Sequence, residues 1–262
     1  LASAHPVSGG TYEYGYVWLS PAFGFTAGWM FMLAKSASAA TAALGLAGYL
    51  LDVLGMGEGG WHVPLAAAGA LSVTAFVAGG IRRSNRGNAV VVGTALLGLL
   101  LLMAFALPVA FTEGTGRFAP FLPEASDAGG VRGLLYGSAL MFVAFTGYGR
   151  IATLGEEVHD PRRVIPRAVV VTVTVVAVLY LGAAASGVGV LGAGAFGAAA
   201  ERTAAPLEAV AAALELPWLA WILGVSAVAA MAGVLLNLVL GLSRVLLAMA
   251  RRSDAPGFLA RI

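Results

Sequence analysis

The sequence has no cysteine and few charged residues. Among its 262 residues, charged side chains make up 11%, whereas about 25% is usual for a soluble globular domain. The absence of cysteine excludes a disulfide-stapled secreted domain, a thiolate metal site and a redox thiol. The scarcity of charge argues against an ordinary soluble enzyme or a disordered tail. The net charge of +2 is also too small for a surface that binds nucleic acid.

Apolar side chains, in contrast, are abundant. They make up 60% of the residues, against roughly 45–50% in soluble domains, and the mean hydropathy is +0.89. This composition predicts an integral membrane protein that has the lipid bilayer as its solvent.

Long apolar segments predict six transmembrane helices. About 20 apolar residues are needed for a helix to cross the bilayer. The segments are continuously apolar and lack the alternation of a β-barrel, so we expect an all-α fold. The predicted spans are 18–50, 63–81, 88–112, 133–155, 168–195 and 216–243.

Arginine residues gather in alternate loops between these spans. Loops 82–87 and 156–167 are rich in arginine, as is the tail that follows the last span, whereas loop 51–62 has none. By the positive-inside rule, the arginine-rich loops are cytoplasmic. We therefore expect a multi-pass protein of the plasma membrane, whose first predicted span runs from inside to outside.

Four aromatic residues lie before and at the start of the first span. We interpret Tyr12, Tyr14, Tyr16 and Trp18 as an interfacial segment of the aromatic-belt type.

The segment from Phe142 to Arg150 contains an interruption of the apolar pattern. Gly147 and Gly149 are followed by Arg150 in the middle of an apolar stretch. Glycine weakens a helix by about 1 kcal/mol relative to alanine. A break here would free carbonyl groups, which membrane proteins tolerate only in a cavity or inside the protein. Transporters use such broken helices to hold a cation or an ammonium group. Glycine-mediated contact between two helices is the alternative.

Three stretches resemble one family of permeases. The run from Ala144 to Ala168 is similar to the sixth-helix signature of the amino acid–polyamine–organocation superfamily, in its cationic amino acid transporter-like branch. The run Pro6–Tyr12 resembles the segment after the family's second helix. Gly241–Arg251, followed by Pro256, resembles the end of its eighth helix.

This resemblance implies a leucine-transporter-like fold. In that fold two inverted repeats of five helices each begin with a helix that is broken at the midplane. The six predicted spans would be helices three to eight, so residues 1–262 would form part of a single transmembrane transporter domain. We also expect helices one and two to lie upstream and further helices downstream, since the sequence begins at Leu1 without a methionine.

The resemblance also implies a substrate site. In the family, carbonyl groups of the broken sixth helix hold the substrate's ammonium, and the matching positions are Val143, Ala144 and Thr146. Gly147 lies in the same segment, and Tyr148 matches an aromatic residue that closes over the substrate. Gly149 departs from the family, because that position is often acidic in relatives.

Lys35 is the only lysine in the sequence and lies within the first predicted span. An ionisable group at this depth usually faces a cavity or a partner. We expect Lys35 to couple transport to protons by titrating. A permanent pair with a group on another helix is the alternative. Some proton-dependent relatives carry such a lysine in helix five, where this sequence has none.

Charges near the cytoplasmic ends of the sixth and eighth helices are candidate gates. Arg150, Glu156, Glu157 and Arg244 would form ion pairs that close the inner vestibule, or would remain solvated charges at the interface.

The eighth helix bears on sodium coupling. Ala232 and Gly233 stand where sodium-dependent relatives have hydroxyl groups, so we expect no dependence on sodium. We expect Asn237 to hydrogen bond to another helix.

Together these features predict a secondary transporter that works by alternating access. Its substrates would be amino acids or related organic cations such as polyamines, and the pattern leaves exchange and proton symport open. A membrane subunit or scaffold without transport activity is the alternative. No spacing of a catalytic motif, cofactor site or metal site is present in the sequence, so we predict no enzyme activity.

Overall fold

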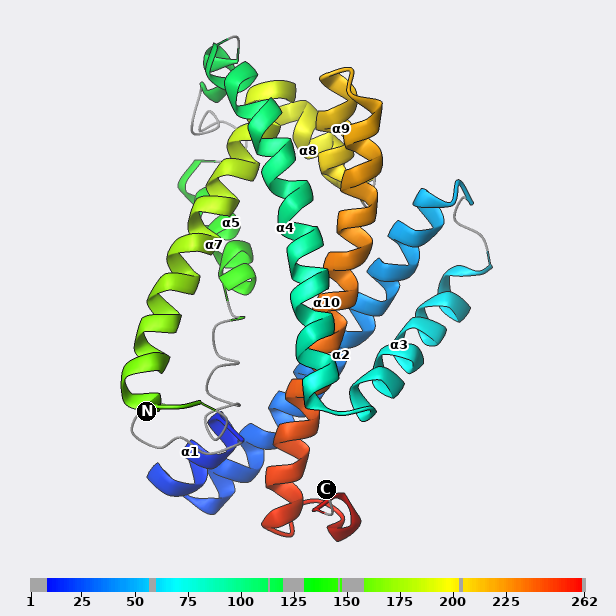
Figure 1. Ribbon diagram of the computed structural model, residues 1–262. Helices are drawn as coiled ribbons and strands as arrows, with labels where there is room; N and C mark the ends of the chain where they lie inside the picture. The colour runs from blue at the N-terminus through cyan, green and yellow to red at the C-terminus, as the bar shows by residue number, and fades with distance from the viewer. Residues whose placement is uncertain are drawn as a thin grey trace.

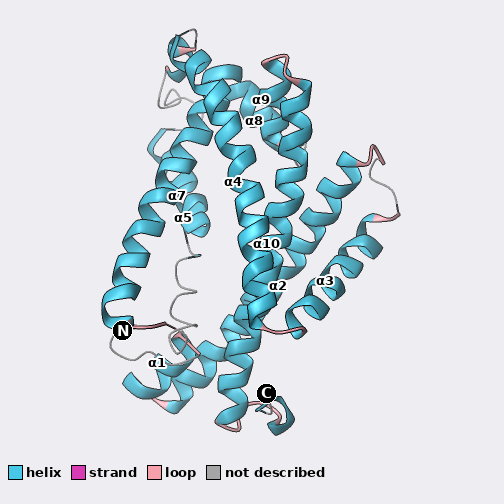
Figure 2. Cartoon of the chain, in the orientation of Figure 1, coloured by secondary structure: helices cyan, strands magenta, loops and turns pink. Residues whose placement is uncertain are grey.

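The computed structural model describes residues 9–56, 60–112, 114–119, 130–145, 147, 158–202 and 205–260. In these ranges all regular structure is helical and no strand is present (Figure 2). The predicted all-α fold is therefore confirmed.

The elements follow one another as short and long helices. In chain order they are α1 (Thr11–Trp18), α2 (Pro21–Val53), α3 (His62–Ala78), α4 (Ile81–Thr112), η1 (Thr115–Phe118), α5 (Gly130–Phe145), α7 (Pro161–Leu191), α8 (Ala193–Arg202), α9 (Pro206–Ala213), α10 (Pro217–Arg251) and η4 (Gly257–Ala260).

Within the described ranges, four helices are long and apolar enough to cross a membrane. They are α2, α7, α10 and the part of α4 from Arg86 to Thr112. The spans predicted at 63–81 and 133–155 correspond to the shorter helices α3, with 17 residues, and α5, with 16 residues. Helix α3 ends before Gly79 and Gly80, and Gly80 has a φ of 107° that only glycine adopts readily.

Several helices begin or end at proline, glycine or capping residues and not at the boundaries predicted from the apolar segments. Helix α2 starts at Pro21, where the Ser20 hydroxyl accepts a hydrogen bond from the Phe23 amide at 3.5 Å. Helix α7 starts at Pro161, seven residues before the predicted span 168–195, because proline fits the first turn of a helix. It ends at Leu191, before Gly192 with a φ of 83°.

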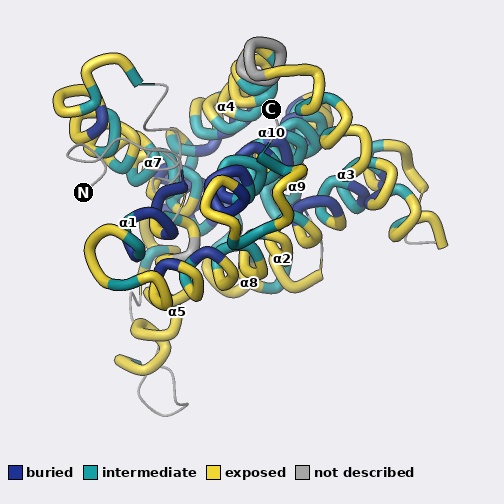
Figure 3. The backbone as a smooth tube through the Cα atoms, turned by 90° about the horizontal axis from the view of Figure 1, so that it is seen from below, coloured by how far each residue is buried: buried dark blue, intermediate teal, exposed yellow. Residues whose placement is uncertain are grey.

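Helix α10 is the central helix of the bundle (Figure 1). It packs against α2 and α4, and α4 packs in turn against α7. Its buried residues form a dark stripe through the middle of the end-on view (Figure 3). On one side Leu235 is buried with Ala42, Ala43 and Ala47 of α2. On another side Leu219 and Leu223 are buried with Leu102 of α4.

The outer surface of the long helices is apolar. Exposed side chains along the long helices include Leu33, Leu97, Val170, Leu181 and Trp221. Such a surface is stable where lipid chains, and not water, cover it.

The interfacial interpretation of the first aromatic residues is wrong for Tyr12. Its side chain is fully buried against Val245, Ala248 and Met249 at the end of α10, whereas Trp18 is 58% exposed. The turn at Gly9–Gly10 and the short helix α1 fold the chain back onto α2 and α10, which places Tyr12 in the protein interior. The local aromatic pattern could not predict this burial, because it depends on contacts between distant segments of the chain.

Candidate functional site

The interruption predicted at Thr146–Gly149 lies outside the described residues, except for Gly147. The described part of α5 reaches Phe145, directly before this segment. The carbonyl groups of Val143 and Ala144 lie in the last described turn of α5. These are the carbonyl groups that the sequence predicts to bind an ammonium.

One of these carbonyl groups has a partner on another helix. The Tyr180 hydroxyl of α7 donates a hydrogen bond to the Ala144 carbonyl oxygen at 3.0 Å. The Tyr180 ring also contacts the Phe145 ring edge-to-face, with 5.2 Å between centroids. Tyr180 thus fixes the end of α5 against α7. A carbonyl oxygen has two lone pairs, so the Ala144 oxygen can accept a second donor.

Several predicted residues lie outside the described ranges. These are Thr146, Tyr148, Arg150, Glu156 and Glu157. Gly147 is described and exposed. The predicted roles of all six in binding or gating stay predictions.

Lys35 lies in α2 and is half-buried. Its ammonium nitrogen is 5.9 Å from the centroid of the Phe31 ring, one turn earlier in the same helix. No carboxylate in the described part of the chain lies within the 4 Å of an ion pair with Lys35. Within that part, Lys35 and the end of α5 also share no hydrogen bond or ring contact, so their predicted proximity stays a prediction.

Asn237 makes the expected hydrogen bond to another helix. Its side-chain amide of α10 donates to the Asn88 Oδ1 of α4 at 2.8 Å. Gly233, one turn before it, lies so close to α4 that a Cβ atom there would be 3.1 Å from Val91 Cγ2. The glycine at a position where sodium-dependent relatives have a hydroxyl therefore has a packing reason in this protein.

The structure shows an ion pair that the sequence did not reveal. Arg252, just after α10, binds Glu13 of α1 through two hydrogen bonds of 2.6 Å and 3.0 Å. Glu13 is buried, and the pair raises the pKa of Arg252 against the opposing effect of partial burial. Arg244, a predicted gate residue, is half-buried in α10 two turns earlier.

Two tyrosines and an aspartate complete this polar cluster, which we call the inner cluster (Glu13, Arg252, Tyr12, Tyr16 and Asp254). Both tyrosine hydroxyls donate to Asp254 Oδ2, from Tyr12 at 2.7 Å and from Tyr16 at shorter range. The guanidinium of Arg252 also stacks on the Tyr16 ring at 4.7 Å. Burial and the bond to Asp254 raise the pKa of Tyr12. The cluster joins α1 to the end of α10 that the arginine pattern predicts to be cytoplasmic.

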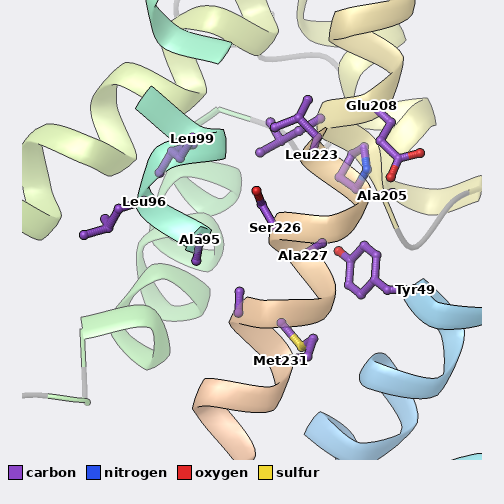
Figure 4. Close-up of a pocket in the computed structure, with 13 residues that line it drawn as sticks. Tyr49, Ala95, Leu96, Leu99, Ala205, Glu208, Leu223, Ser226, Ala227 and Met231 are labelled. Carbon is purple, nitrogen blue, oxygen red and sulfur yellow. The ribbon is translucent and has the colours of Figure 1, made fainter. Parts of the chain in front are cut away.

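No described group of three or more histidine, aspartate or glutamate side chains is arranged to hold a metal ion. A cavity of about 320 Å³ lies between α2, α4, α9 and α10, and none of the predicted substrate residues lines it (Figure 4).

Comparison with protein families gives one match over the whole chain. Residues 1–262 match the family model described as amino acid permease.

Individual relatives are named as transporters. An uncharacterized transporter of Mycobacterium tuberculosis is 35% identical over 262 residues, which cover 100% of this chain and 56% of the relative. A branched-chain amino acid permease of Bacillus subtilis is 27% identical over 282 residues, which cover 100% of this chain and 57% of the relative. Human cationic amino acid transporter 4 is 30% identical over 181 residues, which cover 62% of this chain and 27% of the relative. The chain thus spans little more than half the length of the first two relatives.

Proposed function

Because this chain belongs to the amino acid permease family, we propose that the whole protein is a secondary transporter of amino acids or related organic cations. The observation that carries the proposal is the family match over residues 1–262. The four apolar helices of membrane-spanning length support it. The protein would lie in the plasma membrane and move its substrate by alternating access, without sodium.

The end of α5 is the proposed binding site for the substrate's ammonium. Its support is the resemblance to the family's sixth-helix signature, and the described part of α5 reaches Phe145 at the start of this segment. An ammonium group has three donors, and the negative end of the helix dipole favours a positive charge there. Thr146 and Gly147 would continue this site, and Tyr148 would close over it.

Lys35 is the proposed coupling residue. A charged side chain in the middle of an apolar helix is costly and usually faces a cavity or a partner, which supports a functional role for Lys35. The aromatic neighbour Phe31 supports a partly shielded ammonium. Arg150, Glu156, Glu157 and Arg244 would form the inner gate.

The names of the relatives point to different substrates. One is a branched-chain amino acid permease and another is a cationic amino acid transporter. Uptake of a panel of labelled amino acids and polyamines is therefore the direct test. The natural full-length protein would be reconstituted in liposomes, with and without an inward proton gradient.

Lys35→Met is the informative variant, because methionine keeps the length of the side chain and removes its charge. Uptake that needs the gradient in the wild type and ignores it in Lys35→Met supports proton symport through Lys35. Equal, gradient-independent uptake in both proteins assigns Lys35 a structural role and indicates exchange or facilitated diffusion. The absence of uptake for every amino acid and polyamine would contradict transport of this substrate class and favour a membrane subunit without transport activity.

A further inference from the structure

The cavity of about 320 Å³ has apolar walls contributed by four helices (Figure 4). Its lining includes Leu96 and Leu99 of α4 and Leu223, Ala227 and Met231 of α10. A space of this size is at the lower end of small-molecule sites in proteins.

Three polar side chains interrupt these apolar walls. They are Tyr49 of α2, Glu208 of α9 and Ser226 of α10. The Ser226 hydroxyl already donates to the Thr94 carbonyl oxygen at 3.2 Å, so it offers only an acceptor to a ligand. The Tyr49 ring extends from α2 towards α10, with its hydroxyl at the end nearer Ala227 (Figure 4).

Glu208 is the only ionisable carboxylate among the lining residues. A Cβ atom added to Gly224 would be 3.0 Å from Glu208 Oε1, so the absence of a side chain at Gly224 makes room for the carboxylate beside α10. Within the described ranges, no lysine, arginine or histidine pairs with Glu208 and no hydrogen-bond donor reaches its carboxylate.

This carboxylate lies in surroundings that favour a cation. Burial, together with the negative charge of Asp52, raises the pKa of Glu208. A bound ammonium would supply the missing counter-charge and up to three hydrogen-bond donors. No cationic side chain in the lining could receive the carboxylate of an amino acid, which would be repelled by Glu208.

We propose that this cavity is a binding site for a monoamine with an apolar body, with Glu208 holding the ammonium and the α4 and α10 side chains holding the apolar part. The site is separate from the proposed transport site at the end of α5. The cavity is expected to accept an amine and to reject a zwitterionic amino acid.

Three related compounds test this selectivity. Phenethylamine has the amine alone, 3-phenylpropanoate has the carboxylate alone, and phenylalanine has both on a similar apolar body. Equilibrium binding of each labelled compound would be measured at pH 7.5 on the full-length protein in phosphatidylcholine nanodiscs. The neutral lipid surface prevents electrostatic attraction of the amine to the membrane.

We expect saturable binding of phenethylamine, at least tenfold tighter than that of either carboxylate compound. Glu208→Gln should weaken it by about tenfold or more, since a charge-assisted hydrogen bond becomes a neutral one. The matched control is Glu201→Gln, which removes an exposed carboxylate from α8 and should leave binding unchanged. A second variant, Ala227→Leu, keeps the charge and fills the cavity, and it should also weaken binding.

Three results would overturn the proposal. They are the absence of saturable phenethylamine binding, binding of 3-phenylpropanoate that equals it, and unchanged binding in Glu208→Gln. Unchanged binding in Glu208→Gln is the result expected if phenethylamine binds at the end of α5 and not in the cavity. Amino acid uptake, measured separately, tests the transport function and does not depend on these results.

Discussion

At the scale of single residues, the Tyr180 hydroxyl is the contact that bears most directly on the proposed transport site. It holds a carbonyl group that the substrate's ammonium would also use. Tyr180→Phe keeps the ring contact with Phe145 and removes only this hydrogen bond. We expect KM for uptake to rise about 2- to 10-fold, which corresponds to the net contribution of about 0.5–1.5 kcal/mol for one hydrogen bond. The maximal rate should change little.

Tyr136→Phe is the matched control for this experiment. Tyr136 lies on α5 and is 68% exposed, so the loss of its hydroxyl should leave KM unchanged. An unchanged KM in Tyr180→Phe as well would contradict a role for this hydrogen bond in positioning the end of α5.

Glu208 predicts a dependence of stability on pH. Burial and the nearby negative charge of Asp52 raise the pKa of Glu208 above its ordinary value in the folded protein. The folded state therefore holds this proton more tightly than the unfolded state, and ionisation costs stability as the pH rises through the folded pKa. Glu208→Gln should raise the melting temperature by about 1–2 °C at pH 7.5, a shift that corresponds to less than 1 kcal/mol in a large domain.

The gain should shrink as the pH falls towards 4.5 and disappear below it, where the wild-type carboxyl is protonated in both states. Thermal unfolding between pH 4.5 and 8, followed by tryptophan fluorescence without added amine, measures the difference. A gain that is constant over this range would show that it does not come from ionisation of Glu208.

At the scale of elements, α1 depends on glycines in α2. A Cβ atom at Gly28 would be 2.6 Å from Tyr12 Cδ2 and 3.2 Å from Met249 Sδ. The absence of a side chain at Gly28 therefore lets α1 and the end of α10 meet over α2. Gly28→Val should displace α1 and raise amide exchange in residues 11–18 about 10- to 100-fold, in line with an overpacking cost of about 1–3 kcal/mol.

Gly93→Val is the control for this prediction, because a Cβ atom at Gly93 meets no atom within 4 Å. Exchange in residues 11–18 should match the wild type in this variant. Equal protection of α1 in Gly28→Val and the wild type would mean that α1 does not need this close contact.

The elements also show how far the sequence alone could lead. Apolar length predicted α2, α4, α7 and α10, because the bilayer imposes a continuous apolar segment on each helix. The hydrogen bond of Asn237 was predictable because a polar amide inside an apolar helix needs a partner. The glycines after Phe145 predicted an interruption, which lies outside the described residues except for Gly147 and stays a prediction.

What the sequence could not reveal is pairing between distant segments. Glu13 and Arg252 are separated by 239 positions, and each alone resembles an ordinary interfacial charge. Tyr12 resembles a belt residue until the chain folds back on α10. The cavity has no motif, because its lining comes from four helices and Glu208 lies in a short loop helix without apolar periodicity.

At the scale of the whole molecule, the arginine pattern predicts an orientation in the membrane. Helix α8 and the end of α10 lie at opposite ends of the bundle (Figure 1). The chain has no cysteine, so an introduced cysteine is a unique label within it. In a full-length protein with any other cysteines replaced, Glu201→Cys should react with an impermeant maleimide on intact cells. Ser253→Cys should react only after permeabilisation.

The protein without an introduced cysteine gives the background for this measurement. Both replaced residues are exposed in the structure, so accessibility to the reagent depends only on the side of the membrane. Labelling of Ser253→Cys on intact cells, with Glu201→Cys protected, would reverse the orientation.

Helix α10 has one further consequence, which is mechanical. It contains 35 residues, so it is a rod about 52 Å long at a rise of about 1.5 Å per residue, while the hydrocarbon core is only about 30 Å thick. One end walls the cavity at Leu223 and Ser226, and the other leads directly into Arg252 of the inner cluster. A tilt of about 5° around its midpoint would move each end by about 2 Å, given its half-length of about 26 Å. Helix α10 therefore connects the two ends of the bundle as one continuous helix. A tilt that reshapes the cavity at one end would also stretch the Glu13–Arg252 pair at the other end.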